Sequence, residues 1–146
     1  MEIEIRHRFT ETIILSGNYD SVRDCLEKNR GADLRGADLG GADVRGVYLR
    51  GVYLRGADLR GVYLRDADLR GAEGYQDSHE IFKEIVRRQK LEVFTETEWS
   101  AIGIITIHNL CWDSIKKRFG NVMGRVFEVL AKEGFTEWLE HWNSLA

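Results

Sequence analysis

The stretch GVYLRGVYLRGADLRGVYLR, residues 46–65, consists of four five-residue units that each begin with Gly and end with Leu-Arg. The same frame runs from residue 31 to residue 75 as GADLR, GADLG, GADVR, GVYLR, GVYLR, GADLR, GVYLR, DADLR and GAEGY. A sequence repeat of fixed period indicates an architecture built by stacking similar structural units. The fold of this part of the chain must therefore accommodate a period of five residues.

A period of five fits neither a continuous strand nor a continuous helix. In a strand, side chains alternate between two faces, so Leu34 and Leu39 would point in opposite directions. In a helix, five residues advance by about 500°, which displaces successive leucines by about 140° around the axis. The chain must therefore turn within every unit, and the recurring glycines tolerate the backbone angles of tight turns. The turns would direct the fourth residue of each unit to one axis: Leu34, Leu39, Val44, Leu49, Leu54, Leu59, Leu64 and Leu69.

This segment resembles the pentapeptide-repeat proteins, whose units follow the pattern A(D/N)LXX. The resemblance covers residues 31–75, about a third of the chain, over which nine units run without a gap. It implies a short right-handed quadrilateral β-helix of about two coils, with four units in each coil. Residue n would then lie next to residue n+20. The expected outward columns are Asp33/Tyr53/Glu73, Asp38/Asp58, Asp43/Tyr63 and Tyr48/Asp68.

The segments on either side of the repeats have different patterns. Residues 2–9 alternate between polar and apolar side chains and, with the segment TIILS at residues 12–16, predict a β-hairpin. A short amphipathic helix follows, with Asp20 or Ser21 as its N-cap. We expect residues 1–30 to cover the first edge of the coil, which would otherwise expose unpaired backbone groups.

Residues 76–146 have the spacing of α-helices. Thr95 and Glu98 form the pattern of a capping box, and Gly134 follows a helical apolar stripe as a stop signal. All four Trp residues of the chain lie in this segment, so it has the side chains for a core of its own and is large enough to cap the far end of the coil. The predicted fold class is therefore a β-helix plus α-helices, with domains at residues 1–30, 31–75 and 76–146.

Two parts of the chain are candidates for contacts with a partner. Trp138 and Trp142, four residues apart on the terminal helix, form a candidate seam for binding or dimerisation, and the alternative is that both are ordinary core residues. On the coil, Tyr and Arg are the residue types enriched at the energetic centres of interfaces. The alternative is a solvated coil whose Arg and Asp residues neutralise one another. The candidate interaction face consists of Tyr48, Tyr53, Tyr63, Arg50, Arg55 and Arg65.

The sequence contains no recognisable catalytic pattern. Gly-x-x-x-x-Gly recurs in the repeats, but Ala37 stands where a phosphate-binding loop needs Lys. His108 and Cys111 are spaced to place two metal ligands on one helical face, but no second pair follows at ligand spacing. We therefore expect a non-enzymatic protein without catalytic, cofactor-binding or metal-binding residues.

The preferred functional hypothesis is a protein–protein interaction module whose partner is another protein or a second copy of the chain. The resemblance implies an alternative, an inhibitor or protector of a nucleic-acid enzyme such as DNA gyrase that acts as a mimic of duplex DNA. Two coils would give a stack of only ~10 Å, and residues 31–75 carry equal numbers of Arg and acidic residues, whereas DNA carries one negative charge per ~1.7 Å. Direct binding of nucleic acid is disfavoured because no segment is net basic.

Composition also restricts where the protein acts. The formal net charge is -3, and the longest apolar run, residues 101–107, is far shorter than the roughly 20 residues that span a bilayer. The N-terminus lacks the pattern of a signal peptide. Two cysteines, Cys25 and Cys111, are too few for a disulfide framework. We expect a cytoplasmic protein without a membrane partner.

Overall fold

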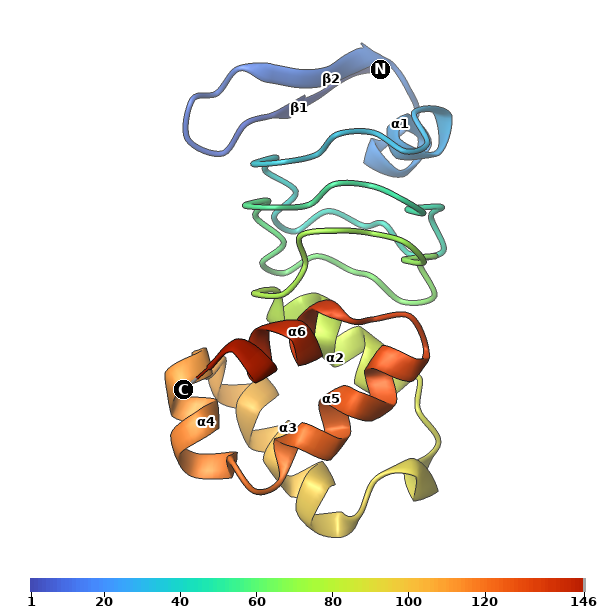
Figure 1. The fold of residues 1–146 in the computed structure, drawn as a ribbon. Helices are drawn as coiled ribbons and strands as arrows, with labels where there is room; N and C mark the ends of the chain where they lie inside the picture. Colours follow the sequence, from blue (N-terminus) through green and yellow to red (C-terminus); the bar gives the residue numbers. More distant parts are fainter. Residues whose placement is uncertain (146) are drawn as a thin grey trace. The chain divides into compact units, whose positions relative to one another are not determined.

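The computed structural model describes residues 1–145 and divides the chain into two compact units, Met1–Glu80 and Ile81–Ala146 (Figure 1). The first unit contains a hairpin, a short helix and the five-residue repeats. The second unit is built from helices. The N-terminal segment and the repeats, which were expected as separate domains, thus lie in one compact unit.

The predicted N-terminal hairpin is confirmed. Strands β1 (Glu2–Arg6) and β2 (Ile13–Asn18) pair in antiparallel orientation, with a bulge after Ile5. The expected extension of the first strand to residue 9 is wrong, because the chain turns after β1. Nδ1 of His7 accepts hydrogen bonds from the backbone N–H groups of Phe9 and Thr10, at 3.2 and 3.3 Å, and the Phe9 side chain is exposed.

Helix α1 (Val22–Lys28) follows the hairpin, as expected. Of the two candidate caps, Ser21 is the N-cap, since its side chain accepts a hydrogen bond from the backbone N–H of Asp24 at 3.1 Å. Cys25 and Leu26 on the inner face of the helix are buried.

The repeats bury the predicted inward side chains and turn at every unit boundary. Each turn contains the fifth residue of one unit and the first residue of the next, for example Arg45 and Gly46. Gly46 has a φ of 70°, the left-handed backbone conformation that glycine adopts without strain. The predicted inward residues are all buried: Leu34, Leu39, Val44, Leu49, Leu54, Leu59, Leu64 and Leu69.

Successive turns of the coil lie 20 residues apart, which confirms the predicted contact of residue n with residue n+20. Isolated parallel bridges join these residues, and the hairpin is the one named sheet in residues 1–145. Because four units separate bridged residues, the coil has four successive sides. We name them by their outward columns: side A (Asp33/Tyr53/Glu73), side B (Asp38/Asp58), side C (Asp43/Tyr63) and side D (Tyr48/Asp68).

The second unit follows the predicted helical spacing. The capping box is present, since Thr95 and Glu98 each accept a backbone hydrogen bond from the other residue. None of the described helices is both long enough and apolar enough to cross a membrane. The helices are α2 (His79–Arg87), the 3-10 helix η1 (Leu91–Val93), α3 (Glu96–His108), α4 (Trp112–Phe119), α5 (Met123–Lys132) and α6 (Glu137–Ser144).

The candidate helical seam is contradicted by the packing of the second unit. Trp138 and Trp142 are 1% and 6% exposed. The ring centroid of Trp138 lies 5.3 Å from that of Phe82, edge to face, and the centroid of Trp142 lies 5.3 Å from that of Phe127. Both tryptophans are therefore core residues of this unit and are not available as an exposed seam.

Candidate interaction surface of the repeats

The three tyrosines of the predicted interaction face lie on three different sides of the coil. Tyr53 is on side A, Tyr48 on side D and Tyr63 on side C. Sides A and C are not adjacent, so Tyr53 and Tyr63 cannot contribute to one flat patch. Tyr53 and Tyr63 are 46% and 61% exposed, whereas Tyr48 is half-buried. The predicted single patch is therefore wrong, and the coil has two separate exposed tyrosines.

In four units that carry both Asp and Arg, the Asp side chain binds the Arg of the same unit. In the first unit, Oδ1 of Asp33 accepts hydrogen bonds from the backbone N–H and Nε of Arg35, at 3.2 and 2.9 Å, and Oδ2 accepts one from Nη2 at 2.6 Å. The same double contact holds the turn in three further units. It joins Asp43 to Arg45, Asp58 to Arg60 and Asp68 to Arg70.

These contacts lower the pKa of three of the acids, Asp33, Asp43 and Asp58. Hydrogen bonds from Arg45 lower the pKa of Asp43 from 3.8 to about 2, with a smaller electrostatic contribution from Arg23. The pKa of Asp33 is lowered by the side chain and then by the backbone of Arg35. The carboxyl groups of Asp33 and Asp43 are therefore ionised and paired at neutral pH.

Units that carry Tyr leave their Arg without this partner. Arg50 reaches Asp68 in the next turn of the coil, with Nε 2.7 Å from Oδ2. Arg55 and Arg65 make no side-chain hydrogen bond or ion pair within residues 1–145. Arg55 lies in a turn between sides A and B, and Arg65 lies in a turn between sides C and D. Of the three arginines in the predicted face, Arg55 and Arg65 thus lack an ion-pair partner within residues 1–145, and each belongs to a unit with an exposed Tyr.

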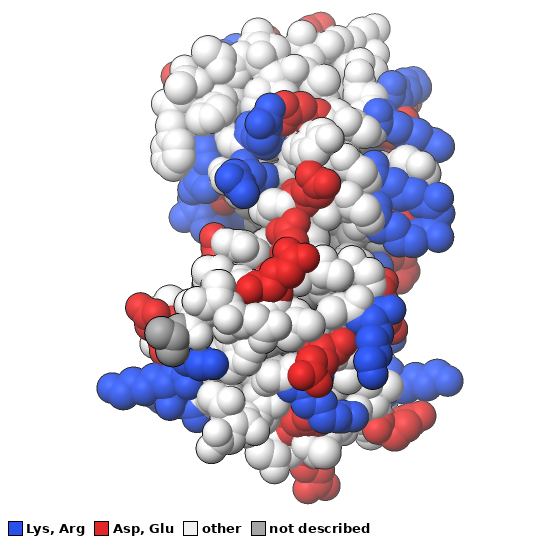
Figure 2. Space-filling model, viewed as in Figure 1, with Lys and Arg blue, Asp and Glu red and all other residues white. Residues whose placement is uncertain are grey.

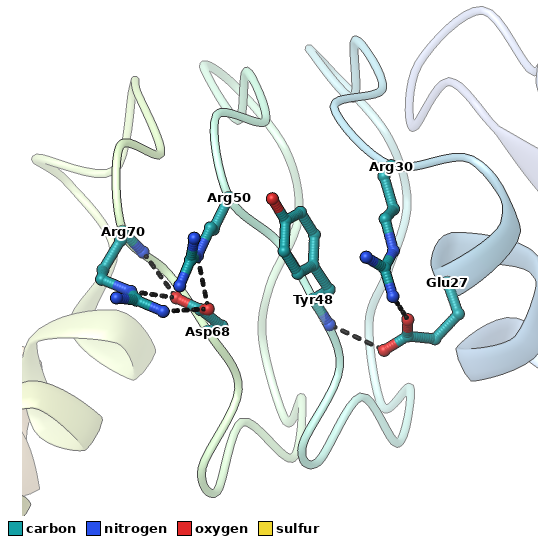
Figure 3. Close-up of polar contacts among 6 residues, drawn as sticks. All are labelled: Glu27, Arg30, Tyr48, Arg50, Asp68 and Arg70. Carbon is teal, nitrogen blue, oxygen red and sulfur yellow. Dashed lines mark hydrogen bonds and ion pairs between the residues drawn. The ribbon is translucent and has the colours of Figure 1, made fainter.

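Tyr48 has a structural position that the sequence did not reveal (Figure 3). The guanidinium groups of Arg30 and Arg50 lie 4.3 and 5.4 Å from the centroid of its ring, and Figure 3 shows the ring between them. Its backbone N–H donates a 2.8 Å hydrogen bond to Oε1 of Glu27, and the other oxygen of Glu27 accepts from Arg30 at 3.2 Å. Tyr48 therefore joins the end of α1 to the first turn of the coil.

Among residues 1–145, no group of three or more His, Cys, Asp or Glu side chains gathers closely enough to hold a metal ion. Cys111 is exposed, and its pKa is lowered mainly by a hydrogen bond with the Ser114 side chain. Cys25 is buried, and its pKa is raised mainly by that burial.

Comparison with known protein families identifies the repeats. A sequence model described as pentapeptide repeats matches residues 32–71 in eight copies. The final unit of the frame, residues 71–75, has Gly74 in place of the inward Leu and extends beyond this match. Pentapeptide repeats imply a quadrilateral β-helix, and the family suggests a role in protein interaction. Comparisons with curated proteins and with solved structures gave no match.

Proposed function

We propose that this chain, whose residues 32–71 belong to the pentapeptide-repeat family, is a non-enzymatic protein-interaction module that contacts its partner through the coil. The observation that carries the proposal is the replacement of Asp by Tyr in the GVYLR units. This replacement leaves Arg55 next to Tyr53 in a turn of the coil, and Arg65 next to Tyr63 in another, without a carboxylate partner.

The coil is suited to hold these side chains rigidly. In the proposed architecture it is a short right-handed quadrilateral β-helix whose first edge is covered by the hairpin and α1. Backbone hydrogen bonds of 2.8 Å from Asp38 to the carbonyl of Arg6, and from Arg8 to the carbonyl of Gly36, support this arrangement. Side chains held on a rigid backbone lose less conformational entropy on binding.

Exposed Tyr and Arg side chains suit a protein partner. Tyr buries a large apolar area while its hydroxyl still forms hydrogen bonds, and Arg binds carboxylates with two parallel hydrogen bonds. Within residues 1–145, Arg55 and Arg65 have no ion pair to break before binding. The gyrase-inhibitor alternative has no comparable support, because four outward acids of the coil are paired with Arg and form no free acidic stripe: Asp33, Asp43, Asp58 and Asp68.

Site-specific photocrosslinking in the cells that produce the protein tests the proposal. The photoreactive residue p-benzoylphenylalanine replaces Tyr53 or Tyr63, and its replacement of Phe9 is the control because Phe9 is an equally aromatic residue that is 77% exposed. We expect a discrete crosslinked protein from position 53 or 63 that is weakened by Arg55→Ala or Arg65→Ala and is not obtained from position 9. The proposal fails if neither tyrosine position gives a crosslink above that of Phe9. A crosslink of the chain to itself would identify the partner as a second copy.

A further inference from the structure

We propose that side D, together with the two columns of turns that border it, binds an acidic segment of the partner protein. This inference rests on the proposed function and specifies the chemistry of the partner. The surface, named the side-D surface below, is formed around Tyr48 by Arg23, Arg30, Arg45, Arg50, Arg65 and Arg70.

The coil register brings these arginines together. Arg45 and Arg65 are 20 residues apart and lie in turns between sides C and D. Arg50 and Arg70 lie in the turns at the other border of side D. Neighbouring strands are separated by about 4.8 Å, so each pair forms a short column.

The N-terminal segment extends both columns. Arg30 precedes Arg50 by 20 residues and stacks on the ring of Tyr48. Nη2 of Arg23, on α1, lies 4.0 Å from the position that a Cβ atom would take at Gly46, in the turn that follows Arg45. The helix and the coil thus contribute arginines to the same surface.

The acids on this surface are fewer than the arginines. Arg50 and Arg70 share the single carboxylate of Asp68, and Arg65 has no ion-pair partner within residues 1–145. The acids that lie among the six arginines are Glu27, Asp43, Asp66 and Asp68. The side-D surface is therefore net positive in a chain whose formal net charge is -3.

Side B has fewer arginines in the turns that border it, namely Arg35, Arg55 and Arg60. Its outward residues Asp38 and Asp58 stack as like charges, and Gly40 occupies a turn position that other units fill with Arg. Figure 2 shows Lys and Arg gathered at both edges of the upper part of the view, with Asp and Glu between them. The turns that border side D carry more Arg than those that border side B, which gives an acidic partner a preferred place to bind.

The details of the surface favour an acidic peptide over a nucleic acid. Single-stranded nucleic acids bind by stacking bases on exposed aromatic rings. The ring of Tyr48 is unavailable for stacking because Arg30 and Arg50 lie against it. The carboxylate of Asp68 within the surface would also repel a continuous phosphate backbone, whereas a separate carboxylate of a peptide can pair with Arg65 without approaching it.

The inference is tested by fluorescence anisotropy with a fluorescein-labelled decaglutamate peptide and the full chain. Wild-type protein should bind the peptide at low salt, and binding should weaken as salt is raised because the interaction is ionic. Arg65→Glu should weaken binding by about tenfold, as expected for reversing a charge that contacts the ligand. Arg60→Glu is the control, since it reverses an Arg whose side chain is 80% exposed in a turn between sides B and C, away from side D. It should weaken binding by less than about twofold.

Three outcomes would overturn the inference: no binding by the wild-type protein, equal weakening by the two variants, or tighter binding of a labelled decathymidylate than of decaglutamate. Circular dichroism of both variants confirms that they remain folded. If the peptide does not bind but the crosslinks at Tyr53 or Tyr63 persist, the acidic character of the partner is rejected and the proposed function stands. If those crosslinks are absent, the proposed function itself fails.

Discussion

The carboxylate of Glu27 accepts a 2.8 Å hydrogen bond from the backbone N–H of Tyr48, 21 residues further along the chain. Within the coil, the equivalent N–H groups donate to backbone carbonyls 21 residues earlier in the sequence. For example, the N–H of Asp68 donates to the carbonyl of Val47 at 2.9 Å. The side chain of Glu27 therefore takes the place of the carbonyl that a preceding coil would supply. Helix α1 thus supplies a hydrogen-bond acceptor to the coil on side D without continuing the repeat.

Glu27→Ala should lower the free energy of unfolding of the first unit by about 1–3 kcal/mol, because it removes a charged hydrogen-bond acceptor from a partly buried N–H. Glu27→Gln keeps an acceptor and should cost less. Urea unfolding measured by circular dichroism gives the stability, and hydrogen exchange of the Tyr48 amide should be faster in Glu27→Ala. Glu2→Ala, at an exposed position of β1, is the control. An unchanged exchange rate at Tyr48 would refute the role of Glu27.

Gly36→Ala should destabilise the protein more than Gly41→Ala. Both glycines have a φ near 70°, so an Ala at either site costs about 1–2 kcal/mol. At Gly36, a Cβ would also lie 2.5 Å from Cδ2 of His7 and closer still to Nε2, whereas at Gly41 it would meet no atom within 4 Å. The clash should add about 1–3 kcal/mol, measured by urea unfolding.

A double-mutant cycle separates the clash from the backbone strain. In the His7→Ala background, the cost of Gly36→Ala should fall to that of Gly41→Ala, because the imidazole is gone. Equal costs of Gly36→Ala with and without His7 would show that the ring does not constrain this glycine.

The inward positions of the repeats and the pairing of their outward residues could be predicted from the sequence, because both follow from the period of five. A repeat of five with a turn in every unit leaves one set of inward positions, and stacking at a separation of 20 fixes which outward residues meet. The same register explains why the single tyrosine patch was wrong. Positions 48, 53 and 63 are separated by fewer than 20 residues, so they occupy different sides of the coil.

The remaining errors concern contacts between segments that have different patterns. The spacing of Trp138 and Trp142 places them on one face of α6 but does not reveal whether that face meets solvent or other helices. The alternation in residues 2–9 continues past the end of β1, where His7 organises a turn through its own side chain. The contact of Glu27 with Tyr48 depends on where α1 meets the coil, which no local pattern encodes.

Trp138→Ala should lower the free energy of unfolding of the helical unit by about 3–5 kcal/mol, because it leaves a large cavity beside Phe82. Urea unfolding followed by far-ultraviolet circular dichroism measures the loss. Glu140→Ala, at an exposed position of the same helix, should change the stability little. A Trp138→Ala protein that keeps its stability but changes its oligomeric state in sedimentation would restore the seam at Trp138 and Trp142.

Acidification should lower the free energy of unfolding of the first unit, and part of this loss should come from the ion pair between Asp43 and Arg45. The pKa of Asp43 in the folded protein is about 2, below its ordinary value of 3.8, so the folded state favours the ionised carboxylate. This contribution to stability is present above pH 3.8 and is lost as the pH falls through about 2. Asp43→Asn removes the titrating group and Arg45→Ala removes its main partner, so both variants should lose less stability than the wild type across this interval. Urea unfolding at a series of pH values measures the three slopes, and a common slope for all three proteins would show that the pair does not contribute.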